Sequence, residues 1–145
     1  MTLYQRQFAI REMDFTHAGE ASVQVKNILK NIGADPDVIR RVAITAYEAE
    51  MNAVMYGLNG LMTLELHEDH ILIIVEDQGP GIPDVDQAMV EGYSTATSQM
   101  REMGFGAGMG LPNIRRNSTE FRVISEPGRG TRLEIVIQAA WRKQQ

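Results

Sequence analysis

The sequence contains no cysteine among its 145 residues. This absence excludes a disulfide scaffold and any cysteine-ligated zinc or iron–sulfur site, and it fits a reducing compartment. The longest apolar run, at residues 71–75, is far shorter than the roughly 20 residues that cross a bilayer. The first residues carry charge and no apolar stretch of the kind found in signal peptides. We therefore expect a cytoplasmic protein.

The chain also lacks an excess of basic residues. Lysine and arginine number 14 against 19 aspartate and glutamate, which gives a net charge of -5 at pH 7. Broad nucleic-acid binding needs a basic face, so we expect no nucleic-acid partner, and no membrane partner either. What the chain does have is a hydrophobic fraction of 43%, which is enough for the core of one compact domain.

Hydrophobic periodicity and turn residues predict helices at residues 16–32, 36–56 and 109–117, with a further helical turn inside 84–91. Alternation and apolar runs predict strands at residues 3–11, 61–67, 70–76, 120–126 and 131–139. Asp35 suits the cap of the second helix, Pro36 suits its first position, and Gly57 suits its end. This order predicts one domain over residues 1–145, of the α+β class. Its fold would be a two-layer sandwich with a mixed, mostly antiparallel sheet covered on one face by about three helices.

The first polar cluster of candidate functional residues is YEAEMNAVMYG, on the second predicted helix. Glu48 and Asn52 are four residues apart and therefore share one face of the helix. An asparagine oxygen can ligate Mg²⁺, and a glutamate one turn away can take a proton. The alternative is a polar stripe that meets water. Glu50 is roughly 160° away from Asn52 around the axis, and we expect it to be solvated.

The second cluster, VEDQGPGIPD, comes where a buried strand ends. Asp77 is placed to accept a hydrogen bond from a ligand amine, and Gly79 and Gly81 would let a ligand approach the backbone closely. The alternative is a turn in which Asp77 caps its own backbone.

The third cluster is MGFGAGMGLPNI, with glycines at 104, 106, 108 and 110 directly before a predicted helix start. Free backbone N–H groups at the positive end of a helix form an anion site. A Rossmann motif would need a preceding strand, and a P-loop would need a following Gly-Lys-Ser/Thr, so both are excluded. A mobile glycine loop is the alternative.

Taken together, the clusters resemble the four-box signature of the GHKL (Bergerat-fold) ATPase superfamily, which includes gyrase, Hsp90, MutL and histidine kinases. The boxes are Glu48-x-x-x-Asn52, Asp77-x-Gly79-x-Gly81, Gly106-x-Gly108-x-Gly110-Leu111 and Gly130-Thr131, within residues 35–137. No helical hairpin with a phosphoacceptor histidine and no transducer domain is visible. The free-standing domain and the segments EDQGPGIPD, EGYST and GFGAGMGLPNIRR resemble the anti-sigma factor and switch-protein serine/threonine kinases.

The resemblance implies ATP and Mg²⁺ as cofactors and gives a role to each matching residue. Asn52 would ligate the metal and Glu48 would be the general base. Asp77 would bind the adenine amine, with Thr131 assisting through a water, and Gly79 and Gly81 would lie against the purine.

The resemblance also implies a lid over residues 85–108 and a phosphate-binding loop after it. The loop would consist of Gly106, Ala107, Gly108, Met109, Gly110 and Leu111. Arg101 is the candidate for a γ-phosphate contact, because a guanidinium matches phosphate oxygens bidentately. Arg115 and Arg116 are expected on the solvent side of the third helix, and His17, His67 and His70 are expected to be ordinary surface residues.

The implied function is phosphorylation of serine or threonine on a STAS-domain partner, an anti-anti-sigma or switch protein, in bacterial signalling. One alternative is a non-catalytic, ATP-gated module that binds a sigma factor or another regulator. A simple ATPase is a third. Homodimerisation through the N-terminal strand and first helix is implied by the resemblance alone.

Overall fold

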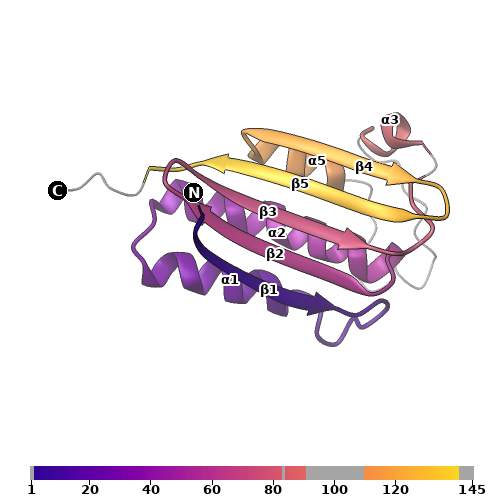
Figure 1. Ribbon diagram of the computed structural model, residues 1–145, viewed down its shortest axis with the longest axis horizontal. Helices are drawn as coiled ribbons and strands as arrows, with labels where there is room; N and C mark the ends of the chain where they lie inside the picture. Colours follow the sequence, from indigo (N-terminus) through magenta and orange to yellow (C-terminus); the bar gives the residue numbers. More distant parts are fainter. Residues whose placement is uncertain (1, 83, 91–109, 141–145) are drawn as a thin grey trace.

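The computed structural model describes residues 2–82, 84–90 and 110–140, which form a five-stranded sheet and the helices that pack on it (Figure 1). In chain order the elements are β1 (Thr2–Ile10), α1 (Glu20–Asn31), α2 (Pro36–Tyr56), β2 (Gly60–His67), β3 (His70–Asp77), α3 (Val85–Ala88), α5 (Gly110–Asn117), β4 (Glu120–Glu126) and β5 (Gly130–Gln138). Within the described ranges, no helix is long and apolar enough to span a bilayer.

The strand order in the sheet is β1-β2-β3-β5-β4, and every pairing among the described strands is antiparallel. The α+β sandwich is confirmed, whereas the parallel component implied by a mixed sheet is not found among these strands. The reason is the position of β5, which lies between β3 and β4 and pairs antiparallel with both. The long connection that leaves β3 therefore does not create a parallel neighbour.

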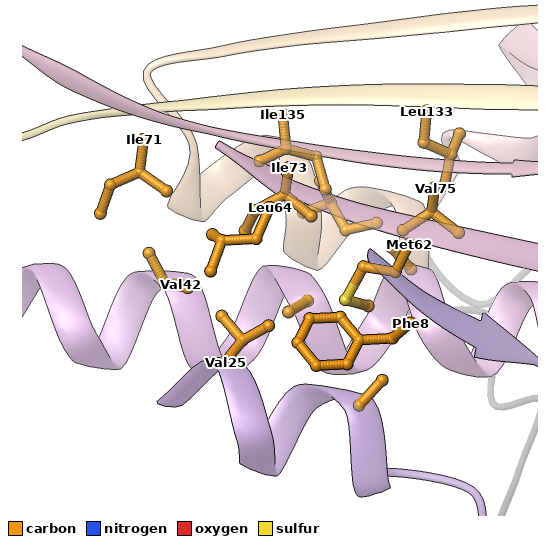
Figure 2. Packing of buried hydrophobic residues seen from close by; sticks show 14 of the residues in the cluster. Phe8, Val25, Val42, Met62, Leu64, Ile71, Ile73, Val75, Leu133 and Ile135 are labelled. Carbon is orange, nitrogen blue, oxygen red and sulfur yellow. The ribbon is translucent and has the colours of Figure 1, made fainter. Parts of the chain in front are cut away.

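Helices α1, α2 and α5 cover one face of the sheet, with α2 in the middle (Figure 1). Alternate residues of the strands point towards these helices, among them Leu64, Ile73 and Ile135, which have no exposed surface (Figure 2). Val25 of α1 and Val42 of α2 meet them from the helical layer and are equally buried. This apolar layer holds α2 against the sheet and so fixes the helix that carries Glu48 and Asn52.

The two ends of α2 follow the local sequence signals. The Asp35 side chain accepts a hydrogen bond from the Asp37 amide at 2.9 Å, and Pro36 occupies the first turn. At the other end the Gly57 amide donates to the Ala53 carbonyl at 2.9 Å, and the helix stops at Tyr56. The predicted bounds of this helix are confirmed.

The start of α1 differs from the prediction. The helix begins at Glu20 and not at residue 16, because Gly19 adopts a left-handed conformation with φ of 97°. The preceding residues form a turn in which the His17 amide donates to Asp14 Oδ1 at 3.3 Å. A left-handed residue cannot be part of a right-handed helix, so the apolar pattern before Gly19 is not helical.

Candidate functional site

Glu48 lies on the side of α2 that packs along α5. Asn52 is one turn further along the same face, and both side chains are half-buried. A Cβ at Gly110, the first residue of α5, would lie 3.5 Å from Glu48 Oε1. The structure therefore places the Glu48 carboxylate beside the first residue of a helix, one turn from Asn52 along α2.

Asn113 is a neighbour of Glu48 that sequence reasoning missed. Its side-chain amide donates to Glu48 Oε2 at 3.1 Å, across 65 positions in the chain. Arg116 in turn donates to Asn113 Oδ1 at 2.6 Å. The i,i+3 spacing of Asn113 and Arg116 on a helix was the available local signal, but the contact with Glu48 depends on the packing of α5 against α2.

Asp77 ends β3 and is half-buried. Its Oδ1 accepts a hydrogen bond from the Gly79 amide at 2.8 Å, so the local cap that the sequence offered as an alternative does form. A carboxylate has about four lone-pair sites, and acceptor capacity therefore remains for a ligand amine. Burial raises the pKa of Asp77, and hydrogen bonds from the Gly79 and Thr131 amides oppose this shift in part.

Thr131 is paired with Asp77 across β3 and β5 and is 6% exposed. Its hydroxyl lies 3.1 Å from the Ser125 hydroxyl. Ser125 also accepts from the Ile82 amide at 2.7 Å, so it ties β4 to the loop that follows Asp77. Ser125 was not singled out from the sequence, because a single serine in a strand carries no motif.

Gly79 and Gly81 are required by the protein's own backbone. A Cβ at Gly79 would lie 2.7 Å from the Tyr56 carbonyl oxygen, and one at Gly81 would lie 2.5 Å from the Glu126 carbonyl oxygen. Gly81 also has φ of +84°. These contacts account for both glycines structurally, and their contact with a purine stays a prediction.

The described residues contain only part of the predicted phosphate-binding loop. Gly110 begins α5, and the Leu111 side chain is 6% exposed and belongs to the core. The other predicted residues of this region lie outside the described residues: Arg101, Gly106, Ala107, Gly108 and Met109. Of the predicted lid, the short helix α3 is described.

The prediction that Glu50 is solvated was wrong. Glu50 is 3% exposed. Its carboxylate accepts hydrogen bonds from the amides of Gly19 at 3.0 Å, Ala21 at 3.3 Å and Ser22 at 2.9 Å, and from the Ser22 hydroxyl. The side of α2 opposite Asn52 is covered by the start of α1, so Glu50 caps that helix and takes no part in the site.

The three histidines lie outside the site, and Arg116 is linked to it through Asn113. His17, His67 and His70 each lie within 3.0 Å of a neighbouring carboxylate, and the His67 and His70 rings stack at 4.4 Å. Arg115 and Arg116 are exposed, as predicted. In the described parts of the chain, no group of three or more histidine, aspartate or glutamate side chains could hold a metal ion.

Comparison with known proteins identifies the family. The family described as histidine kinase-, DNA gyrase B-, and HSP90-like ATPase matches residues 25–140. The chain belongs to this ATPase family.

Its relatives include a serine/threonine-protein kinase, RsbT of Bacillus subtilis, which is 32% identical over 77% of this chain and 80% of that protein. The anti-sigma F factor of Clostridium novyi is 32% identical over 78% of this chain and 80% of the relative.

Solved structures support the fold. The RsbU and RsbW domains of a Mycobacterium tuberculosis protein superpose with a TM-score of 0.60 at 17% identity, over 95% of this chain and 35% of that one. The mycobacterial sensor histidine kinase MprB superposes with a TM-score of 0.55 at 14% identity, over 96% of this chain and 100% of that one. Membership in an ATPase family supports ATP as the nucleotide.

Proposed function

We propose that the protein is an ATP-dependent serine/threonine kinase of the anti-sigma regulatory type that phosphorylates a STAS-domain partner. The observation that carries this proposal is the position of Glu48, whose Oε1 faces the first residue of α5 one turn from Asn52. A general base can act in phosphoryl transfer only when it lies close to the phosphate. The N-terminus of a helix favours phosphate binding, so Glu48 lies where a base would be needed. The kinase and anti-sigma factors among the relatives support the same function.

ATP would lie between the end of β3 and the start of α5. Asp77 would accept a hydrogen bond from the adenine amine, supported by Thr131, and the backbone amides that begin α5 would bind phosphate oxygens. Asn52 fits a magnesium ion, because its half-buried amide supplies one hard oxygen. Mg²⁺ commonly takes few protein ligands and completes its shell with phosphates and water. When bound, the ion would neutralise charge on the phosphates.

Transfer would proceed in line. The oxygen of the partner's hydroxyl forms a bond to the γ-phosphorus while the bond from that phosphorus to the bridging oxygen breaks, and ADP leaves. Glu48 takes the proton of the attacking hydroxyl on Oε1. Asp77, by contrast, only positions the nucleotide.

The test uses γ-labelled ATP and a panel of purified STAS-domain proteins from the same genome. Wild type should label one of them on serine or threonine. Glu48→Gln should bind ATP normally and lose labelling, whereas Asn52→Ala should lose binding of ATP with Mg²⁺. Glu68→Gln and Asn27→Ala change the same residue types at exposed positions and should behave as wild type. Full labelling by Glu48→Gln would show that the base is another group.

A second candidate is an ATP-gated anti-sigma module without turnover, favoured by relatives that are named anti-sigma F factors. Co-elution with a sigma factor should then depend on ATP, and no label should be transferred to any partner. Mapping of phosphosites after a pull-down with ATP or with ADP separates the two candidates.

A further inference from the structure

We propose that Asn113 is a positioning residue for Glu48 and that Arg116 fixes the orientation of the Asn113 amide. This inference rests on the proposed function, because Glu48 matters only if it acts as the base. It adds to the site two residues on α5 that the family signature in this sequence does not include.

Two consecutive hydrogen bonds link an exposed side chain, that of Arg116, to Glu48 in the site. The exposed Arg116 guanidinium donates to Asn113 Oδ1 at 2.6 Å, and Asn113 Nδ2 donates to Glu48 Oε2 at 3.1 Å. Asn113 and Glu48 are both half-buried, so the second bond is partly shielded from water. All three residues belong to helices, and helices hold side chains more precisely than loops do.

The chemistry of the groups fixes the amide orientation. A guanidinium can only donate hydrogen bonds, so the atom facing Arg116 must be the Asn113 oxygen. The Asn113 nitrogen must then face Glu48, whose ionised carboxylate can only accept. Both bonds involve a charged partner, which makes them stronger than bonds between neutral groups. Reversing the amide would place like atoms opposite each other at both ends.

As a consequence, the two carboxylate oxygens of Glu48 have different roles. Oε2 is held by Asn113, while Oε1 points towards Gly110, where a Cβ would lie 3.5 Å away. Gly110 has no side chain to cover Oε1, and a Cβ at this position would be in van der Waals contact with that oxygen. Asn113 thus sets the side-chain rotamer in which Oε1, to which no described residue donates a hydrogen bond, faces the attacking hydroxyl.

The first test measures kcat and KM for ATP in the labelling assay with the STAS-domain substrate. Asn113→Ala should lower kcat about tenfold, since a small misplacement of a reacting group has effects of this size or larger, and should leave KM within about twofold. Asn113→Asp should lower kcat further, because an oxygen would then face Glu48. Arg116→Ala should lower kcat less, and Arg116→Lys should restore part of it by keeping a donor.

Matched controls lie on the same helix. Arg115→Ala removes an adjacent exposed arginine, and Asn117→Ala removes an amide that bonds to the Asn113 carbonyl oxygen at 2.9 Å. Both should keep the kcat of wild type. Wild-type kcat in Asn113→Ala would overturn the proposal. A raised kcat would also overturn it, because it would mean that Asn113 restrains Glu48.

A second readout does not depend on activity. The side-chain NH₂ resonances of Asn113 in a ¹⁵N-correlated NMR spectrum should move in Glu48→Gln and in Arg116→Ala, and should not move in Arg115→Ala. Unmoved resonances would show that the contacts are absent and overturn the inference. A wild type that transfers no label, with these shifts intact, would overturn both proposals through the failure of the proposed function. Normal transfer by Asn113→Ala would overturn this inference alone.

Discussion

Two glutamates on α2 have opposite environments although they are two residues apart. Glu50 is 3% exposed, and three backbone amides and one hydroxyl donate to it. Glu48 is half-buried, receives the Asn113 amide on one oxygen and presents the other towards Gly110. Residues two apart on a helix point to nearly opposite sides, so one of them faces α1 and the other faces α5. A carboxylate whose lone pairs are used by the fold stabilises the protein, and one that keeps a free oxygen is available for chemistry.

The largest effect is expected at the available carboxylate. Glu48→Gln should lower the rate of phosphoryl transfer by about 100-fold or more, the range associated with loss of a general base. Its melting temperature and its affinity for ATP should stay close to wild type, because the amide can still accept the bond from Asn113. Labelling kinetics and differential scanning fluorimetry measure the two properties on the same sample. A large loss of stability would mean that Glu48, like Glu50, mainly stabilises the fold.

The second effect is expected at the buried carboxylate and should be of the opposite kind. Glu50→Gln places an NH₂ group among the amides of Gly19, Ala21 and Ser22, so at least one donor loses its acceptor. The free energy of unfolding should fall by about 2 to 3 kcal/mol, the cost of leaving a buried donor unsatisfied. Urea denaturation measures it, with exposed Glu68→Gln as the control. ATP affinity should change less than about twofold. A selective loss of ATP binding with normal stability would contradict the assignment of a structural role to Glu50 and a functional role to Glu48.

The contrast also explains which features could be predicted from the sequence. The bounds of α2 depend on Asp35, Pro36 and Gly57, which act on their neighbours in the chain, and they were predicted correctly. The strands along the chain were predicted from alternation and turns, whereas their order in the sheet, with β5 between β3 and β4, was not predicted. The burial of Glu50 could not be predicted, because it depends on where α1 packs, and the apolar pattern before Gly19 suggested a different start for that helix.

The residues of the candidate site also fall into two groups: those predicted from local motifs and those that depend on the packing of distant segments. Glu48, Asn52 and Asp77 were found because spacing and neighbouring glycines form motifs. Asn113 was missed because its partner is 65 positions away, and its spacing with Arg116 does not reveal the contact with Glu48. Leu111 was predicted as part of the phosphate loop, and its side chain packs in the core. The contact of its backbone amide with phosphate stays a prediction.

A smaller effect is expected at Asp35, which accepts a hydrogen bond from a backbone amide at the start of α2, as Glu50 does at the start of α1. Asp35→Ala removes the acceptor of the Asp37 amide and should cost about 1 kcal/mol of unfolding free energy, typical of a lost N-cap. Asp35→Ser should restore most of it, since serine also caps well. Thermal and urea denaturation measure both. The cost should be below that of Glu50→Gln because the Asp35 cap is solvent-exposed, and equal costs would show that burial adds nothing to a cap.

The smallest effect is expected at Asp77, which is intermediate between the two glutamates: half-buried and held by the Gly79 amide at 2.8 Å. Burial raises its pKa in the folded protein above the unfolded value of about 4. The folded state therefore binds the proton more tightly, and the stability of wild type decreases as pH rises through the range between these two values. Asp77→Asn cannot ionise, so at pH 7 it should be more stable than wild type, by less than about 1 kcal/mol because the side chain is partly solvated.

The exposed Asp69 provides a control of opposite sign for this last prediction. Its hydrogen bond with His70 lowers its pKa in the folded protein, so it contributes stability above the unfolded value that is lost as pH falls through the lowered one. Asp69→Asn should therefore melt below wild type at pH 7, where Asp77→Asn melts above it, and both differences should vanish in acid, where the carboxyl groups are protonated. Scanning fluorimetry from about pH 2 to about pH 8, which extends below the usual pKa range of aspartate, follows both curves. A lower melting temperature for Asp77→Asn at pH 7 would mean that the Gly79 and Thr131 amides outweigh burial, and that Asp77 belongs with Glu50 among the carboxylates that stabilise the fold.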